Sequence, residues 1–446
     1  MSPTIFALAT SPGRAAVAIV RISGPGARQA LVTVAGAAPR PGRVRLARLR
    51  NHQGEWLDTA LTLFFAAPRS YTGEDCAELH LHGGQAVIDG VTAALLEQGL
   101  RPAEPGEFTR RAFESGKLDL DQAEAVADLV DAESAAQARQ ALGQLEGKLG
   151  VRYREWREAL IEALARLEAA VDFPDEELPR DVIDQARGAL ERLARELDAA
   201  LGDEARGQRV REGYRIAVIG APNSGKSSLL NALSGRDAAI VTHIPGATRD
   251  IIEVPLVVDG YKVVLADTAG IRETHDPVEV EGVRRARAWA TAADLRLWVV
   301  DQAENGGGWR EALDLVRSGD ICILNKSDLP AGADMAEARS AASARSLETA
   351  ALSLIGGRAD ALASRLSVRV RHDLSGADFP AVTRARHEAL LREARGHLGR
   401  ALDELREPEL AAEDARLAGR ALARVSGRID AEDILERVFA TFCIGK

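Results

Sequence analysis

The sequence predicts a doubly wound α/β domain inserted into an all-α helical domain, with an α+β domain in front of both. Three observations lead to this fold class. Short β-like runs and turn residues fill the first part of the chain, and long stretches of Ala, Leu, Glu and Arg at helical spacing follow. From Tyr214 onward, apolar strand-like runs alternate with loops and helices. A chain of 446 residues is long enough for roughly two to four domains.

Residues 1–117 mix β-like runs with one helical stretch. The β-like runs include Ala16–Val20 and Leu61–Phe65, and the helical stretch lies near Val87–Leu96. Apolar runs of period two combined with a single segment of helical period are typical of an α+β domain.

Residues 118–210 have the composition of long helices. Phe173-Pro174-Asp175 is the only strong interruption, so two or three long helices are expected there. Helical composition returns after about residue 371 and continues to the end of the chain. The simplest interpretation makes residues 118–210 and 372–446 the two halves of one helical domain. A separate C-terminal domain is the alternative.

Residues 211–371 predict the inserted α/β domain. The expected strands are the apolar runs Ile216–Ile219, Ile251–Val258, Tyr261–Ala266, Leu295–Val300 and Ile321–Leu324. Asp259-Gly260 separates two β-branched runs and predicts a hairpin turn, so one edge of the sheet should be antiparallel.

Composition excludes several classes of protein. A hydrophobic content of 46% with 28% charged residues is ordinary for a globular protein. A net charge of −10 argues against binding nucleic acid mainly through a general coat of Lys and Arg, so a nucleic-acid partner would need a local patch or a second protein. No apolar run approaches the ~20 residues of a membrane helix, and no signal-peptide pattern begins the chain. We therefore expect a cytoplasmic protein without a membrane partner.

Only three cysteines occur, and they are far apart in the sequence. Because Cys76, Cys322 and Cys443 are odd in number and widely spaced, they indicate neither a disulfide framework nor a zinc site. Any role for a cysteine must be that of a single thiol.

The segment from Gly220 to Ser227 has the pattern of a phosphate-binding loop. It reads Gly-Ala-Pro-Asn-Ser-Gly-Lys-Ser, follows a predicted strand and opens a predicted helix, which is the context that such a loop requires. Its backbone amides and the helix N-terminus would face the phosphates. Lys226 is expected to reach the β- and γ-phosphates, and the Ser227 hydroxyl to bind Mg²⁺. The remaining expected nucleotide contacts of this loop are Asn223, Ser224, Gly225 and Ser228.

Two further motifs follow in the order that a Ras-like G domain requires. Asp267-Thr268-Ala269-Gly270 ends a predicted strand, where Asp267 can hold Mg²⁺ through water and the amide of Gly270 can sense a γ-phosphate. Asn325, Lys326 and Asp328 stand in the segment Asn-Lys-Ser-Asp, whose aspartate can accept hydrogen bonds from the N1 and N2 donors of guanine. The expected ligand is therefore GTP.

Two less regular segments complete the predicted nucleotide site. A further guanine-binding segment aligns best with Ser353-Leu354, which precedes Gly356-Gly357. In the segment Gly246–Asp250, the hydroxyl of Thr248 is the expected second Mg²⁺ ligand. Together with the preceding motifs, these segments predict a Ras-like P-loop G domain over residues 211–371.

The position that follows the Asp-x-x-Gly motif departs from the Ras pattern. Ras-like GTPases have a glutamine there that orients the attacking water, whereas this chain has Ile271. Asn223 and the long segment Asp237–Asp250 resemble those of GTPases that use K⁺ as a fixed positive charge. A facing G domain commonly orders such a loop, so activity should rise on dimerisation. The expected K⁺ ligands are the Asn223 side chain and backbone carbonyls around Thr242, Ile244 and Ala247.

Motifs spread along the whole chain resemble the MnmE family. The matching segments are Pro12–Arg14, Tyr71–Asp75, Gly106–Phe113, Gly116–Leu120, Gly246–Asp250, Asp267–Thr274 with Val278-Glu279, and the terminal Phe442–Lys446. The segments near the two ends distinguish the chain from other GTPases. Two departures exist: Ala247 replaces the threonine usual before Thr248, and Ala15-Ala16 replaces the usual glycine pair after Arg14.

The resemblance implies a function in the modification of tRNA. It implies a homodimer whose N-terminal domain binds 5-formyl-tetrahydrofolate or a related folate, followed by a helical domain that carries the inserted G domain. It also implies an FAD-dependent partner, MnmG. With this partner, the chain would install an aminomethyl-type group, as in carboxymethylaminomethyl-uridine, on C5 of the wobble uridine of certain tRNAs.

The resemblance also implies roles for particular residues. Glu279 matches the acidic residue that orients the attacking water, which makes Glu279, Lys226 and Thr248 the expected catalytic residues. The folate site would lie close to Cys443, a possible reactive thiol. The residues that match the folate site are Arg21, Glu78, Lys117 and Lys446.

Two other functions remain open from the sequence. A ribosome-assembly GTPase that also uses K⁺ would share the G domain, but it should carry an RNA-binding KH-like module or a second G domain, and neither is found. In a nucleotide-controlled assembly switch, hydrolysis would only time the release of a partner. Binding of formyl-tetrahydrofolate by residues 1–117 together with the C-terminus would argue against the assembly switch.

Overall fold

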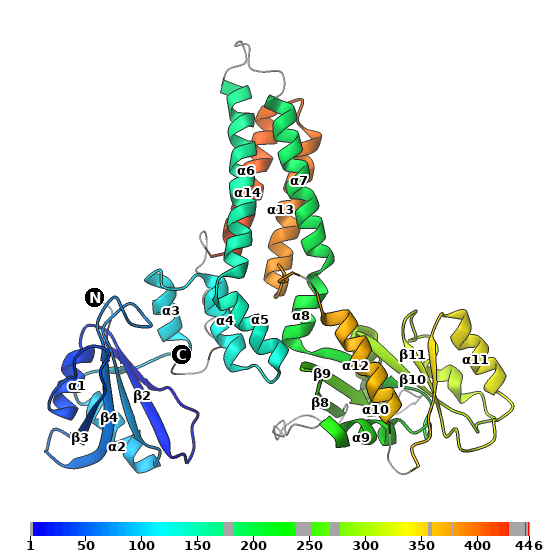
Figure 1. Ribbon diagram of the computed structural model, residues 1–446, viewed down its shortest axis with the longest axis horizontal. Coiled ribbons are helices and arrows are strands. Elements are labelled where there is room, and N and C mark those ends of the chain that lie inside the picture. Colours follow the sequence, from blue (N-terminus) through cyan, green and yellow to red (C-terminus); the bar gives the residue numbers. More distant parts are fainter. Residues whose placement is uncertain are drawn as a thin grey trace. The chain divides into compact units, whose positions relative to one another are not determined.

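The computed structural model describes residues 3–172, 182–237, 252–267, 277–355, 359–376, 378–427, 442 and 445. The chain divides into two compact units, shown with their helices and strands in Figure 1. One unit contains Met1–Ala127, Gln144–Ala194 and Leu390–Lys446, and the other contains Asp128–Gly143 and Arg195–Ala389. Among the described helices, none combines the length and apolar character that a membrane crossing requires.

The N-terminal domain is built on a six-stranded sheet in the order β3-β4-β5-β2-β1-β6. All pairings are antiparallel except that of β1 with β6. Its strands are β1 (Ile5–Leu8), β2 (Val17–Ser23), β3 (Arg45–Arg50), β4 (Trp56–Phe65), β5 (Cys76–His82) and β6 (Arg101–Pro102), and its helices are α1 (Ala27–Ala35), α2 (Gln85–Leu96) and α3 (Glu107–Glu114). The α+β prediction for this region is confirmed, although β2 and β4 are longer than the predicted runs.

The two faces of this sheet have different covers. Alternate residues of β2 to β5 are buried against α1 and α2, because side chains in a strand point to opposite faces in turn. On the other face, Ile5 and Ala7 pack against Phe108 of α3. Farther along that face Leu46 and Leu61, which are paired across β3 and β4, remain 65% and 44% exposed. Only part of the second face is therefore covered within the described chain.

Helices before and after the insertion pack together in the first unit. They are most of α4 (Leu120–Val130), α6 (Lys148–Asp172), the larger part of α7 (Val182–Gly202), α13 (Ala385–Asp403) from Leu390 onward, and α14 (Pro408–Val425). The other helices of this region, α8 (Glu204–Glu212) and α5 (Ala135–Leu145) except its last two residues, belong to the second unit. Small buried residues of α14, such as Ala411, Ala415 and Ala418, let its backbone approach α6, which buries Trp156 and Leu160.

This packing decides between the two predicted arrangements of the C-terminal part. Because residues from Leu390 onward share a compact unit with Gln144–Ala194, the alternative of a separate C-terminal domain is wrong. Residues 118–210 contain two long helices, α6 and α7, as expected. The shorter α4, α5 and α8 were not separated by the sequence pattern, since all five helices share one composition.

The inserted domain has a six-stranded sheet in the order β12-β11-β10-β7-β9-β8. Only β8 is antiparallel to its neighbour, which confirms the doubly wound prediction and its antiparallel edge. The strands are β7 (Tyr214–Ile219), β8 (Ile252–Val258), β9 (Tyr261–Asp267), β10 (Leu295–Asp301), β11 (Ile321–Asn325) and β12 (Glu348–Ala351), and the helices are α9 (Lys226–Asp237), α10 (Pro277–Ala292), η1 (Gly308–Ala312), α11 (Met335–Ala344) and α12 (Asp360–Leu374).

Helices cover both faces of this sheet. Residues of α9 and α12 share one apolar cluster with alternate strand residues, and residues of α10, η1 and α11 share another. Leu362, Leu366 and Val370 of α12 belong to the first cluster, so this helix packs on the sheet and begins well before residue 371, where helical composition was expected to return.

The hairpin between β8 and β9 is fastened at its turn. Asp259 and Gly260 have φ values of 52° and 80°, which is the conformation of a tight two-residue hairpin turn. The carbonyl of Gly260 accepts a hydrogen bond from the amide of Ala136, 2.9 Å away, and Asp259 pairs with Arg371 of α12. Lys262 pairs with Glu133 at 2.5 Å. Residues 133–136 therefore hold the hairpin to the helical part of the same unit.

A buried ion pair supports the start of β11, and removing one partner should destabilise the domain. Arg296 and Asp320 are each 3% exposed, and the Asp320 carboxylate also accepts the amide hydrogens of Arg296 and Arg317. We predict that Asp320→Ala lowers the free energy of unfolding by about 3 kcal/mol or more, because Arg296 would remain buried without its partner.

The measurement is urea unfolding followed by circular dichroism. Asp314→Ala, which removes an exposed partner of Arg287, is the matched control and should stay near the wild-type midpoint. Equal midpoints for the two variants would contradict the structural importance of the buried pair.

Candidate functional site

The predicted nucleotide residues meet at one edge of the second sheet. The phosphate-binding loop follows β7, Asp267 ends β9, and Asn325 ends β11. Because β7, β9, β10 and β11 are parallel, their carboxyl ends lie at the same edge. Ligands bind at this edge in open α/β sheets.

The phosphate-binding loop is held in a compact form by its own lysine. Lys226 is buried, and its Nζ donates hydrogen bonds to the carbonyls of Gly220 at 2.9 Å and Ala221 at 2.7 Å. Burial lowers the pKa of Lys226 below its ordinary value, and the nearby carboxylate of Asp267 opposes this shift. Asn223 has a φ of 60°, a left-handed conformation that Asn tolerates better than most residues.

The loop touches the Asn325 side chain closely. The Asn325 Nδ2 donates a hydrogen bond to the carbonyl of Ser224 at 2.8 Å. Gly225 has a φ of 100°, and a Cβ there would lie 2.1 Å from the same nitrogen. Only glycine can therefore occupy position 225 without moving the loop or Asn325.

Oxygen atoms gather beside the loop. The hydroxyl of Ser227 donates to Asp267 Oδ2 at 2.6 Å, so the two residues expected around Mg²⁺ are in direct contact. Asp267 Oδ1, Ser224 Oγ and Asn325 Oδ1 are buried and have no hydrogen-bond partner among the described residues. Buried oxygens of this kind normally have a partner, so their concentration here indicates a place for a ligand.

The guanine-reading segments also lie together. Ser353 Oγ donates to Asp328 Oδ1 at 2.6 Å, and the amide of Ser327 donates to the carbonyl of Leu352 at 3.0 Å. Lys326, with a φ of 57°, places its Nζ 2.6 Å from Asp301 Oδ2. The structure thus brings the irregular segment around Ser353 and Leu354 beside Asp328.

Several predicted site residues lie outside the described residues. These are Thr242, Ile244, Ala247, Thr248, Gly270, Cys443 and Lys446. The backbone of Glu279 belongs to α10, whereas its side chain is not described. The K⁺ site can therefore be followed only at Asn223, which is exposed.

Two residues of the predicted folate site form an ion pair on the N-terminal sheet. Arg21 Nε lies 3.0 Å from Glu78 Oε1, and Glu78 Oε2 lies 3.1 Å from His80 Nε2. The guanidinium of Arg21 stands over the rings of Tyr71 and Phe108, with 5.5 and 5.8 Å to their centroids. The pair is therefore bordered by aromatic rings on the less covered face of the sheet.

The third residue, Lys117, is exposed, and its Nζ donates to the carbonyl of Pro68 at 3.0 Å. The C-terminal end of the chain also reaches this domain. Gly445 packs so tightly against β1 that a Cβ at this position would lie 2.3 Å from the carbonyl oxygen of Leu8. Leu8 pairs with Val20, the neighbour of Arg21.

A polar network joins two motifs that are far apart in the sequence. Arg111 is buried and pairs with Glu74 and Glu107, each at 2.9 Å. Burial opposes the charge of Arg111, but its hydrogen bonds to the two carboxylates outweigh this effect and raise its pKa. The Tyr71 hydroxyl lies 2.8 Å from that of Thr109. Residues 71–74 are thereby fixed to α3.

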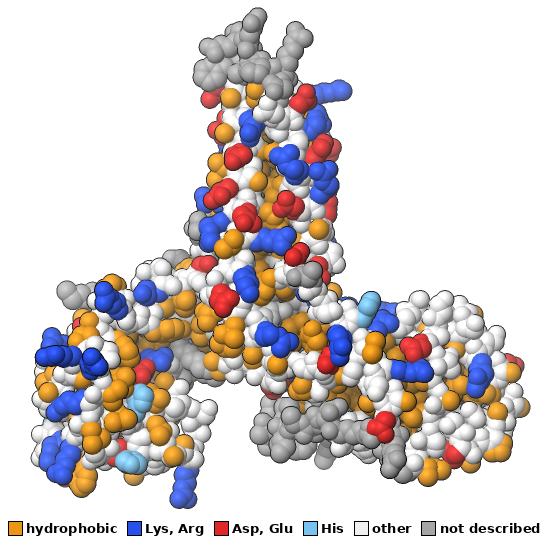
Figure 2. Space-filling model, in the orientation of Figure 1, with side chains coloured by type: hydrophobic (Ala, Val, Ile, Leu, Met, Phe, Trp, Pro, Cys, Tyr) orange, Lys and Arg blue, Asp and Glu red, His pale blue; other side chains and the backbone are white. Residues whose placement is uncertain are grey.

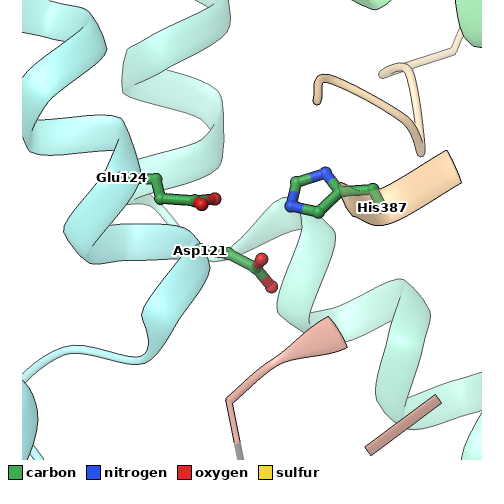
Figure 3. Close-up of side chains that lie close together, drawn as sticks. All are labelled: Asp121, Glu124 and His387. Atoms are coloured by element: carbon green, nitrogen blue, oxygen red, sulfur yellow. The ribbon is translucent and has the colours of Figure 1, made fainter. Parts of the chain in front are cut away.

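Buried carboxylates also occur where the sequence pattern predicts only a helical scaffold. Figure 3 shows Asp121 and Glu124 projecting from α4, and each is 1% exposed. The carbonyl of Asp121 accepts a hydrogen bond from Gln144 Nε2 at 2.7 Å. In the other unit, His387 is fully buried, with its Nδ1 3.3 Å from the Thr383 hydroxyl. Helical periodicity does not reveal such residues, since charged side chains usually mark the exposed face.

One member of the nucleotide region could have been found from the sequence. Asp301 ends the apolar run of β10 just as Asp267 ends that of β9, and both runs are parallel strands of one sheet. A polar residue at the carboxyl end of a buried parallel strand is a candidate for the ligand edge.

Apart from Cys443, the chain has two cysteines, and neither presents an exposed thiol. Cys76 is buried, and burial raises the pKa of the Cys322 thiol to about 12.

The contact at Gly225 generates a direct test. We predict that Gly225→Ala reduces the affinity for GTP, the expected ligand, by about 100-fold or more, because the added methyl group must displace the Asn325 amide from the loop. Binding is measured by the fluorescence of a labelled GTP analogue. Gly235→Ala in α9 is the control, because a Cβ at position 235 meets nothing within 4 Å. Equal affinity of the two variants would contradict the close packing of the loop.

Comparison with known proteins agrees with this geometry. Residues 4–117 match the family model described as the GTP-binding protein TrmE N-terminus, and residues 120–443 match that of the MnmE helical domain. Proteins named tRNA modification GTPase MnmE from Caulobacter vibrioides and Phenylobacterium zucineum are 58% and 57% identical over 100% of both chains. The Rhodospirillum rubrum protein of the same name is 50% identical over 99% of each chain.

Among solved structures, the G domain of the T. maritima FeoB iron transporter matches 35% of this chain and 98% of its own, at 20% identity and a TM-score of 0.26, which is too low to bear on the fold. The family models and the full-length relatives are decisive. Together with the assembled G-domain motifs, they show that the chain belongs to the MnmE family of tRNA modification GTPases.

Proposed function

We propose that this GTPase depends on K⁺ and acts with an FAD-dependent, MnmG-like partner to modify C5 of the wobble uridine in tRNA, using a formyl-tetrahydrofolate cofactor. The observation that carries the GTP-dependent part is the gathering of Lys226, Ser227, Asp267 and Asn325 at one sheet edge, with buried oxygens that lack protein partners. The family's role in tRNA modification supports the substrate.

Each residue of the nucleotide site has a proposed task. Lys226 leaves the loop carbonyls and pairs with the β- and γ-phosphates, which compensates its burial with an opposite charge. Asp328 accepts the guanine N1 and N2 hydrogens, and Ser353, in contact with it, holds its carboxylate in place. Glu279 orients the attacking water from the start of α10. The remaining contacts are those of Asn223, Gly225, Ser228, Thr242, Gly270 and Leu354.

The oxygen donors fit a magnesium ion. Mg²⁺ prefers oxygen ligands and keeps several waters, and the hydroxyl of Ser227 together with the carboxylate of Asp267 offers this chemistry. We assign Ser227 and Thr248 as direct ligands and Asp267 as a contact through water. The ion would neutralise charge on the phosphate oxygens.

The proposed potassium site rests on Asn223 and on Ile271. Asn223 is exposed on the loop and offers a side-chain oxygen. Ile271 has no polar group that could orient the attacking water. The carbonyls of Thr242, Ile244 and Ala247 would complete the site. A monovalent cation there would supply the fixed charge that an arginine supplies in other GTPases.

The proposed folate site joins Arg21, Glu78, Lys117 and Lys446. Basic side chains suit the glutamate carboxylates of a folate, and the Glu78 carboxylate suits its pterin donors. The aromatic rings beside Arg21 and the approach of Gly445 to β1 support a site at this place. Folate binding requires Glu78 to exchange Arg21 and His80 for ligand donors, and Cys443 would lie close to the bound ligand.

The proposed architecture follows from these sites. Residues 1–117 form the folate-binding and dimerisation domain, residues 118–210 and 372–446 form the helical domain, and residues 211–371 form the G domain. Two chains would associate through the N-terminal domains, whose sheet is covered on only part of its second face. A nucleotide-controlled assembly switch remains the second candidate, and the absence of folate binding would favour it.

The potassium proposal predicts a difference between two salts. GTP turnover in KCl should exceed that in NaCl of equal ionic strength by about tenfold or more. The reason is that a K⁺ ion held at the proposed site would stabilise the negative charge that develops on the phosphates in the transition state. Asn223→Ala should lose most of this difference while GTP still binds. Steady-state phosphate release at several concentrations of each salt is the measurement, and equal turnover in both salts would reject the K⁺ site.

The folate proposal predicts that substitutions at the folate site weaken the binding of folate but not the binding of GTP. Glu78→Gln and deletion of Lys446 should each weaken the binding of 5-formyl-tetrahydrofolate by about tenfold or more, because a charge-assisted hydrogen bond is lost. GTP affinity should not change. Glu97→Gln, at an exposed ion pair of the same domain, is the matched control. Titration calorimetry measures both ligands, and full folate affinity in the Glu78 and Lys446 variants would refute the site.

A further inference from the structure

The first part of the chain concentrates positive charge in an otherwise acidic protein. The first 54 residues contain eight arginines and neither Asp nor Glu, whereas the whole chain carries a net charge of −10. Figure 2 shows several Lys and Arg side chains on the N-terminal domain, at the left of the view, with few acidic ones among them. A local basic surface is what an acidic protein needs in order to hold a polyanion.

Five of these arginines follow one another along an edge of the sheet. We call Arg40, Arg43, Arg45, Arg48 and Arg50 the arginine strip. All five are exposed. The first two precede β3 and the others belong to it, and β3 is the outermost strand of the sheet. At about 3.3 Å per residue, the strand portion alone extends roughly 15–20 Å.

Three members of the strip form no ion pair within the part of the chain that the structure describes. Arg45 donates to the carbonyls of Ala35 and Ala37, and Arg50 donates to that of Gly54, so both help to hold local structure. Arg40, Arg43 and Arg48 have no carboxylate partner among the described residues. The two nearest acidic residues along the chain are otherwise engaged, because Glu55 accepts a hydrogen bond from Asn51 and Asp58 pairs with His82. Glu97, a more distant one, pairs with His52.

An exposed aromatic ring lies beside the strip. Trp56 is 64% exposed, and the guanidinium of Arg48 stands over its ring, 5.6 Å from the centroid. Arginines that track a phosphate backbone, combined with an exposed aromatic ring for base stacking, are typical of surfaces that bind single-stranded nucleic acid. Charges on an edge strand also prevent sheets from joining edge to edge, but that role needs no exposed tryptophan.

We propose that the arginine strip and Trp56 bind tRNA, with the arginines on its phosphodiester backbone and Trp56 stacked on an unpaired base. The inference rests on the proposed function in taking tRNA as the substrate. It adds that this chain itself contacts the RNA, through the edge of its N-terminal sheet. The opposite charge of the polyanion and the unpaired arginines provide the affinity.

The test uses the full chain and unmodified transcribed tRNA, with binding followed by fluorescence anisotropy at several salt concentrations. Arg40→Ala, Arg43→Ala and Arg48→Ala are combined, because the first two side chains make no described contact and that of Arg48 contacts only the Trp56 ring, which belongs to the same proposed surface. The triple variant should lose at least about tenfold in affinity, and the slope of log K against log salt should fall by about 2 to 3 as three phosphate contacts disappear. A charge-matched triple variant of α7 (Arg187, Arg192 and Arg195, all to Ala) should bind as the wild type does.

The tryptophan gives a second readout that a purely electrostatic surface would not produce. Trp56→Ala should weaken the binding of tRNA by about tenfold, because base stacking is lost, and should leave the binding of a fully paired RNA duplex nearly unchanged. An equal effect on both RNAs, or on neither, would remove the stacking role.

Four outcomes would overturn the inference. They are no tRNA binding by the wild-type chain near physiological salt, equal losses in the two triple variants, a change in self-association alone, and binding of anionic phospholipid vesicles but not of tRNA. GTP turnover in KCl is measured in the same preparations. If the strip variant binds tRNA as the wild type does and its GTP turnover is still stimulated by K⁺, the tRNA-binding role of the strip is rejected and the proposed function is not. If GTP turnover of the wild-type chain does not respond to K⁺, the proposed function itself is rejected.

Discussion

The functional edge of the second sheet depends on how closely the phosphate-binding loop passes over its neighbouring strands. The strand order places β10 between β7 and β11, so a loop that leaves β7 toward Asn325 must cross the end of β10. A Cβ on Gly220 would lie 2.2 Å from the carbonyl of Val299 in β10, and one on Gly225 would lie 2.1 Å from Asn325 Nδ2. Glycine at these two positions is therefore a steric requirement of the topology.

Much of this edge could be predicted from the sequence because its signals are local. Apolar runs bounded by loops indicate the buried strands, and the spacing of Gly, Lys and Asp residues indicates the loops that follow them. β12 escaped prediction because Glu348–Ala351 is a short run with little apolar character. Its strand conformation is imposed by pairing with β11. Sequence-local propensity does not contain such tertiary effects.

Contacts between distant residues could not be predicted. The Tyr71–Thr109 and Glu74–Arg111 pairs join residues that are 38 and 37 positions apart, and Asp301 reaches Lys326 across two strand ends. The sequence identifies Tyr71, Glu74, Thr109 and Arg111 as parts of conspicuous segments, but only the fold shows which of them touch. The same holds for the Gly445 contact with β1, which brings the two ends of the chain into one domain.

The chain uses arginine and lysine for different purposes. It contains only six lysines, and Lys226 and Lys326 both have their Nζ within 3 Å of oxygen atoms at the nucleotide edge. Lysine is a compact charge on a flexible stem, which suits a group that must exchange one set of oxygens for another. Arginine, with its planar fork, serves the lasting contacts, as in the buried Arg111 and Arg296 pairs.

The fastened turn between β8 and β9 limits how this part of the molecule can move. Sliding one strand along the other would break the Ala136–Gly260 hydrogen bond together with the ion pairs of Asp259 and Lys262. A one-residue slip would also carry every side chain of the strand to the opposite face of the sheet. Because β9 also pairs with β7 along its length, up to Asp267 opposite Val218, the turn and the sheet together fix where the Asp267 carboxylate meets the nucleotide edge.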